Sequence, residues 1–134
     1  MAGETNLSLL LRSMAPHLNE GDYVFCTLLP GTAIDLTHVV GSFREQEGLT
    51  VILARDKAQA LGLSFDYVAA WITLNVHSAL QAVGLTAAFA TALGEAGISC
   101  NVIAGYYHDH LFVAREHADR ALEALLRLAH LNAL

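Results

Sequence analysis

The sequence predicts an α/β protein, of the α+β type, built from two interdependent units with antiparallel sheets and helices on one face. Short runs rich in β-branched and aromatic residues alternate with helical patterns along the whole chain. Residues 53–58 line up with residues 113–118 as strand, Arg, acidic residue and helix. No linker rich in Pro, Gly or Ser separates the halves. We therefore expect an N-terminal half, residues 1–66, and a C-terminal half, residues 67–134, that fold together.

The first half opens with a helix predicted over residues 7–14. This helix ends before Pro16, and its apolar residues recur at helical spacing: Leu7, Leu10, Leu11 and Met14. Strands are predicted over residues 23–29 and 49–54, where strand-forming residues are concentrated. The segment 34–44 between them fits a strand slightly better than a helix. A short helix over residues 56–61 ends at Gly62.

The second half has a predicted strand over residues 71–76 and a helix over residues 86–96 that stops at Gly97. Strands over residues 98–106 and 111–114 follow, and the last helix, 116–131, has an apolar stripe on one face. Each half thus has the order helix, strand, strand, helix. Two such halves that share strands give two interdependent ferredoxin-like βαββαβ units. Their open sheet edges favour a homodimer.

Composition and charge exclude several classes of partner. The formal net charge is -6, and the seven Lys and Arg residues are scattered singly, so we expect neither a nucleic acid nor a membrane as partner. Cys26 and Cys100 lie in apolar segments without a CxxC pattern, which is typical of free thiols in a reducing compartment. No targeting segment and no membrane-spanning run is evident. We expect a soluble, cytoplasmic protein.

No arrangement typical of catalysis is found in the sequence. Ser78 follows His77, but adjacent residues on a strand point to opposite faces, and no acid is placed to orient the imidazole. The glycines between residues 97 and 105 lack the Lys-Ser/Thr element of a phosphate-binding loop. We therefore expect no enzymatic activity and no cofactor.

A ligand site is predicted where a loop opens the helix at residues 86–96. The loop residues Val83, Gly84, Leu85 and Thr86 would leave backbone N–H groups free to hold the carboxylate of a small ligand. The Thr86 hydroxyl could join them. The structural alternative is that Thr86 only caps the helix and Gly84 only forms a turn.

The histidines offer a different hypothesis. His108 and His110 are two residues apart, so on a strand both point to one face, a spacing that can hold a metal ion. Asp109 would face the opposite side of a regular strand, and no third ligand is identifiable. The alternative function is therefore a metal-binding or enzymatic protein that uses His77, His108 and His110.

The second half resembles the ACT domain, a small-molecule-binding module attached to many enzymes of amino-acid metabolism. The resemblance rests on the strand at residues 71–76, the loop at 83–86, the turn at 95–99 and the segment 108–113. The subtype is similar to the regulatory regions of aspartate kinases and to tandem-ACT arginine sensors. Residues 43–51 look like the partner half of stand-alone bacterial ACT-like proteins. Two departures are the Val83-Gly84 pair, where the family has Pro-Gly, and the absence of a catalytic domain in this chain.

The resemblance implies further ligand contacts and a function. Asn101 and Val102, near the start of a strand, would meet the amino-acid group of the ligand, and Asp109 would pair with its ammonium group. The implied function is a non-catalytic regulatory protein that binds an amino acid and controls a separate enzyme in trans. A ligand-free protein-interaction module with the same core is the remaining alternative.

Overall fold

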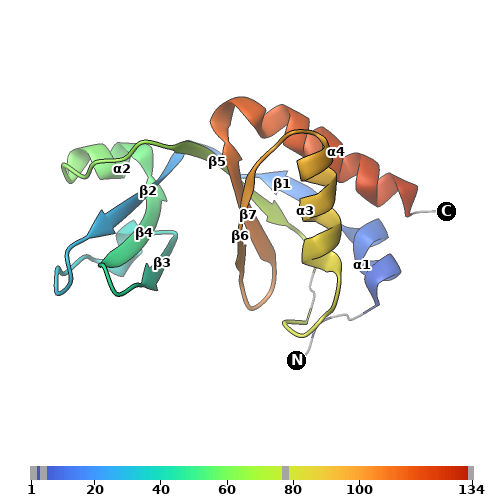
Figure 1. The fold of residues 1–134 in the computed structure, drawn as a ribbon, viewed down its shortest axis with the longest axis horizontal. Helices are drawn as coiled ribbons and strands as arrows, with labels where there is room; N and C mark the ends of the chain where they lie inside the picture. The colour runs from blue at the N-terminus through green and yellow to red at the C-terminus, as the bar shows by residue number, and fades with distance from the viewer. Residues whose placement is uncertain (1–2, 4–5, 77–78, 133–134) are drawn as a thin grey trace. The chain divides into compact units, whose positions relative to one another are not determined.

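The computed structural model describes residues 3, 6–76 and 79–132, and the chain divides into two compact units (Figure 1). The inserted unit is Glu20–Ala69, and the split unit combines Met1–Asn19 with Ala70–Leu134. These units differ from the sequence halves 1–66 and 67–134, because the first helix and strand of the chain pack with the C-terminal half.

The inserted unit is a sheet covered by one short helix. Strand β2 (Tyr23–Leu28) pairs antiparallel along its whole length with β4 (Leu49–Ala54), and β3 (Gly41–Arg44) pairs with the other side of β4. The first residues of β5 (Val68–Leu74) pair with the start of β2. Successive side chains of a strand point to opposite faces of the sheet, so Val24, Cys26 and Leu28 of β2 point into one core. That core includes Ala58 of α2 (Arg55–Ala60).

The split unit has the strand order β1-β5-β7-β6, with helices α1, α3 and α4 packed on one face. Its elements are α1 (Leu7–Ser13), β1 (Pro16–Leu18), α3 (Leu85–Glu95), β6 (Cys100–Ala104), β7 (Asp109–Ala114), the 3-10 turn η2 (Arg115–His117) and α4 (Ala118–Leu131). Strand β1 pairs antiparallel with β5, and β6 pairs antiparallel with β7. The N-terminal β1 thus occupies the place of the fourth strand that would follow α4 in a ferredoxin-like unit.

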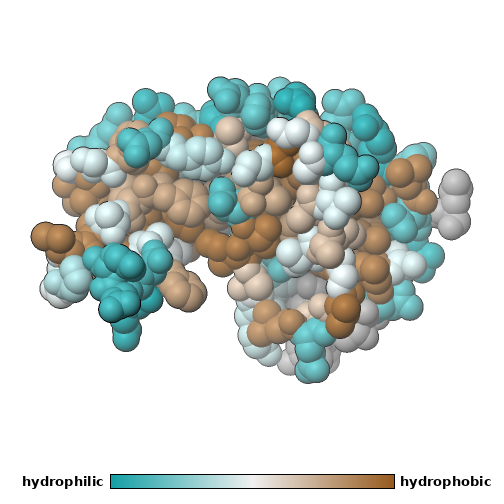
Figure 2. All heavy atoms as spheres, in the orientation of Figure 1, coloured by the Kyte–Doolittle hydropathy of each residue, from teal (hydrophilic) through white to brown (hydrophobic). Residues whose placement is uncertain are grey.

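Helix α4 shows how the sequence pattern sets this packing. Its apolar stripe buries Ala121 and Leu125 against the sheet, whereas Asp119, Glu123 and Arg127 turn to solvent. Hydrophilic residues accordingly line the upper border of the view in Figure 2, along the region of α4. No helix in the described part of the chain is long and apolar enough to cross a membrane.

The predicted fold class is confirmed, and two local differences have clear causes. The segment 34–44, expected as a strand, contains the 3-10 turn η1 (Leu36–His38) before β3. The side chain of Asp35 starts this turn by accepting a hydrogen bond from the Thr37 N–H at 3.0 Å. The strand β1 was not predicted, because three residues beginning with Pro16 are too few for a periodic signal.

Candidate functional site

The N-terminus of α3 has no side-chain cap. Gly84 is its N-cap residue, at φ +98°. The first intrahelical bond runs from the Ala88 N–H to the Gly84 carbonyl at 2.9 Å. The N–H groups of residues 85–87 therefore lack an intrahelical partner, as at any helix start. Thr86 is exposed and does not act as the cap that the structural alternative required.

Gly84 is held in place by α1. A Cβ at Gly84 would lie 2.9 Å from Cδ2 of Leu7, and its φ of +98° is strained for any side chain. The loop is therefore tied to the first residue of α1, and only glycine fits there without a shift in the structure.

Asp109 lies at the same end of the split unit as this helix start. Its partner in the β6–β7 ladder is Ala104, the last residue of β6. Helix α3, with 11 residues at about 1.5 Å each, spans roughly 16 Å, which matches the five residues of β6 at about 3.3 Å each. The chain reverses between α3 and β6, so the start of α3 and the end of β6 lie at one end, as Figure 1 shows.

The Asp109 side chain belongs to the helix-covered face of the sheet. It alternates with Leu111 and Val113, both of which pack in the core with α3. Asp109 is only 9% exposed, and it accepts no hydrogen bond from any residue that the structure describes. Burial raises the pKa of its carboxyl group, and the nearby His110 and His108 oppose this shift. A buried carboxylate of this kind is suited to pair with a cationic group.

The other predicted residues are distributed unevenly. Val83 is 82% exposed beside the open helix start, whereas Leu85 is 3% exposed and belongs to the core. The Val102 side chain also packs against this core, so Leu85 and Val102 could offer a ligand only backbone groups. Asn101 is opposite Phe112 in the β6–β7 ladder, on the face away from the helices. The structure thus brings the loop and Asp109 to one end and does not bring the Asn101 side chain to them.

A polar network on the helix-free face of the split unit was not foreseen from the sequence. The Trp71 Nε1–H donates to Nδ1 of His110 at 3.1 Å, and Oγ1 of Thr73 lies 3.2 Å from the same nitrogen. The Asn19 amide donates to Oγ1 of Thr73 at 2.9 Å. Trp71 and Thr73 are two residues apart on β5, so strand alternation is the signal that could have placed them together.

The geometry argues against His110 as a metal ligand. Its Nδ1 accepts a hydrogen bond from Trp71, so the proton of the neutral ring is on Nε2 and neither nitrogen has a free lone pair. Nδ1 of His108 lies 3.4 Å from the Val76 carbonyl, which leaves Nε2 of that ring available. His77 lies outside the described residues. Within residues 3, 6–76 and 79–132, no group of three or more His, Cys, Asp and Glu side chains could hold a metal ion.

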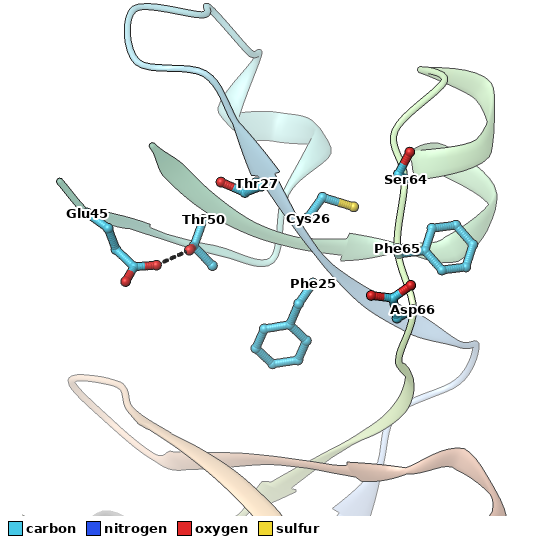
Figure 3. Close-up of a pocket in the computed structure, with 8 residues that line it drawn as sticks. All are labelled: Phe25, Cys26, Thr27, Glu45, Thr50, Ser64, Phe65 and Asp66. Atoms are coloured by element: carbon cyan, nitrogen blue, oxygen red, sulfur yellow. Dashed lines mark hydrogen bonds between the residues drawn. The ribbon is translucent and has the colours of Figure 1, made fainter. Parts of the chain in front are cut away.

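The inserted unit has a separate groove of about 530 Å³ beside β2 (Figure 3). Its lining combines aromatic, hydroxyl and acidic side chains from β2, from the β3–β4 hairpin and from the segment that precedes β5: Phe25, Cys26, Thr27, Glu45, Thr50, Ser64, Phe65 and Asp66. Sequence reasoning missed this groove, because its residues are scattered over the first half of the chain.

Comparison with known families identifies both parts of the chain. Family models described as ACT domain match residues 2–70 and residues 67–127. The chain belongs to the ACT-domain family. The predicted recognition of a tandem ACT protein is thereby confirmed, and membership supports a regulatory, ligand-binding role. The two family matches overlap at residues 67–70, whereas the compact units place Met1–Asn19 with the C-terminal part of the chain.

Solved structures share the fold of this chain. This ACT-domain protein is 56% identical to a protein of unknown function from Vibrio cholerae, described as a possible transport protein. The similarity covers 92% of this chain and 95% of that chain, with a TM-score of 0.82. No curated protein matches the chain.

More distant structures share the fold alone. An Agrobacterium tumefaciens protein is 17% identical, with a TM-score of 0.67, and covers 87% of this chain and 89% of its own. The regulatory subunit of aspartate kinase from Thermus thermophilus, in a ligand-free form, is 10% identical, with a TM-score of 0.60. That similarity covers 87% of this chain and 98% of the subunit.

Proposed function

We propose that this ACT-domain protein binds a free amino acid at the start of α3 and regulates a separate protein in trans. One observation carries the proposal: an uncapped helix N-terminus lies at the same end of one unit as the Asp109 side chain, which is 9% exposed and accepts no hydrogen bond from the residues that the structure describes. The two features offer donors for an anion and an acceptor for a cation. A free α-amino acid carries both charges, on groups attached to the same carbon atom.

The expected contacts follow from the charges. The ligand carboxylate would accept hydrogen bonds from the N–H groups of residues 85–87, where the helix dipole favours negative charge. The ligand ammonium would donate to the Asp109 carboxylate, a charge-assisted hydrogen bond. Because burial raises the Asp109 pKa, the ammonium would also favour the ionised form of this carboxyl group.

Binding could be transmitted within the split unit through α1. Leu7 of α1 touches Gly84, so a ligand at this loop would favour one placement of α1 relative to α3. A ligand shifts such an equilibrium only by its difference in affinity for the two arrangements. The partner protein would recognise the arrangement that the ligand favours, and no catalysis by this chain is required.

Two further parts of the proposal concern assembly and location. Strands β6 and β3 each pair on one side only within their own units, and such edges are suited to a homodimer. Cys26 and Cys100 are free thiols, which fits a reducing compartment such as the cytoplasm.

A thermal-shift screen of the full chain against the twenty amino acids tests the ligand proposal. A true ligand at about 100 times its dissociation constant stabilises the fold by roughly 2.7 kcal/mol. The hit should be lost in Asp109→Asn and kept in the matched control Asp119→Asn, which changes an exposed carboxyl on α4. If no amino acid raises the midpoint, the protein is a ligand-free interaction module instead.

A further inference from the structure

The groove beside β2 exists because a strand ladder stops early. Strand β2 pairs with β4 from Tyr23 to Leu28, but with β5 only at Tyr23 and Val24. The chain before β5, residues 64–66, departs from β2 and leaves space beside its second half. Figure 3 shows this segment separating from β2, with Asp66 turned toward the strand.

The backbone of Thr27 faces this space. The Arg55 N–H donates to the Asp22 carbonyl at 2.9 Å, in the same register as the β2–β4 ladder. Hydrogen-bonded pairs alternate along an antiparallel ladder, so those with β4 fall at the even-numbered residues of β2. The N–H and C=O of Thr27 therefore point away from β4, where no strand pairs with them in the described part of the chain.

One carboxylate of the groove accepts a hydrogen bond. The Thr50 hydroxyl donates to Oε1 of Glu45, and the Glu45 and Gly48 backbones bond to each other across the hairpin turn. Gly48 allows this turn to approach β2, since a Cβ there would lie 2.3 Å from the Leu28 carbonyl oxygen. Glu45 is exposed, and its hydrogen bond with Thr50 places the carboxylate beside Thr50 at the groove.

The charges of the groove select the kind of ligand. Glu45 and Asp66 are its two ionisable carboxyl groups, and no Lys, Arg or His lines it. The guanidinium of Arg55 lies 5.8 Å from the Phe65 ring and 4.0 Å from the Asp22 carboxylate, outside the lining. The two carboxylates would repel an anionic ligand, whereas an ammonium or guanidinium group would find carboxylate and hydroxyl acceptors.

We propose that this groove is a second ligand site, which binds a small organic cation with an apolar body. Glu45 and Asp66 lie on either side of Phe25 in the view of Figure 3, so either carboxylate can attract the charged group while Phe25 contacts the apolar part. A volume of about 530 Å³ lies in the usual range for small-molecule sites, roughly 300–1,000 Å³. The site belongs to the inserted unit and does not rest on the amino-acid site at α3.

The proposal is tested by titrating the full chain, followed by backbone amide NMR. The probes are phenethylamine, agmatine and putrescine, with 2-phenylethanol and 3-phenylpropionate as the uncharged and anionic counterparts of the first. We expect the amines to bind with dissociation constants on the order of 1 mM. The shifts should centre on Thr27, Thr50 and Ser64 and weaken in high salt.

Two variants and one control localise the binding. Glu45→Gln keeps the acceptor for Thr50, and both it and Asp66→Asn should weaken amine binding about 3- to 5-fold, as expected for exposed charges. Glu47→Gln removes an exposed charge from the same turn without touching the groove and should bind as the native chain does.

Several outcomes overturn the proposal. The proposal is wrong if 2-phenylethanol or 3-phenylpropionate binds as well as phenethylamine. It is also wrong if both variants bind the amines with native affinity, or if no amine shifts any amide resonance. The Asp109→Asn variant should titrate with amines as the native chain does. A loss of amino-acid binding in that variant alone would concern the α3 site and leave the groove proposal standing.

Discussion

The indole N–H of Trp71 donates a hydrogen bond to Nδ1 of His110 at 3.1 Å, and this bond fixes the state of the histidine. An indole nitrogen is a donor only, so Nδ1 must be unprotonated and the imidazole proton must be on Nε2. Protonation of His110 would place its Nδ1–H donor against the N–H donor of Trp71. The bond therefore connects β5 and β7 only while His110 is neutral.

This relationship predicts a pH-dependent signal from the single tryptophan. Burial lowers the pKa of His110, His108 lowers it further, and Asp109 opposes them. As the pH falls, the unfolded chain therefore binds this proton before the folded chain does. The free energy of unfolding should decrease from the ordinary histidine range down through the folded pKa. Trp71 fluorescence should change over the lower part of this interval.

The control for this titration is His110→Asn. An asparagine oxygen can accept the Trp71 N–H without titrating, so the fluorescence change should disappear while the fold remains. Persistence of the same transition in this variant would assign it to another group.

Asp109→Asn is expected to stabilise the ligand-free protein at neutral pH. The folded-state pKa of Asp109 is raised, so the stability of the native chain decreases as pH rises through that pKa. The neutral side-chain amide in the Asp109→Asn variant does not ionise, so the variant does not lose stability in this way. Urea unfolding at several pH values measures the difference, which should be absent at a pH below the ordinary Asp range. Lower stability of the variant at pH 7 would show that the carboxylate has a partner in the folded state.

Gly84→Ala should destabilise the chain by about 1–3 kcal/mol. The φ of +98° alone costs roughly 1–2 kcal/mol for a residue with a Cβ, and the contact with Leu7 adds to it. In a Leu7→Ala background the contact part should disappear and the backbone part should remain, which thermal unfolding of the double-mutant cycle can separate.

Gly94→Ala is the matched substitution within the same helix. Gly94 is exposed, and a Cβ there would meet nothing within 4 Å. Alanine should therefore stabilise α3 by about 0.5–1 kcal/mol. A loss of stability at this position would mean that the surroundings of Gly94 are tighter than the structure shows.

The sequence predicts most of this fold because its elements have strong periodic signals. The stripe of α4 and the apolar runs of β4 and β5 need only local spacing to be recognised. The pairing of β1 with β5 joins residues such as His17 and Thr73, which are far apart in the chain. Local spacing carries no information on such a pair.

The candidate site, like the fold, is predictable from local spacing only in part. The start of α3 was predicted from Gly84, and alternation places Asp109 on the helix-covered face. The side of the sheet taken by Asn101 depends on the register of β6 against β7, which the sequence does not specify. The Trp71–His110 bond and the groove beside β2 depend on distant pairings and on a ladder that ends early.

The position of β1 has a consequence for synthesis on the ribosome. The strand pairings within the inserted unit join residues between Tyr23 and Ala69, so they can form while the rest of the chain is still being made. The first helix and strand must then wait for β5, α3 and α4 before they gain a core. Nascent chains that stop before α4 would carry Leu10 and Leu11 uncovered, and they are the species on which chaperones would act.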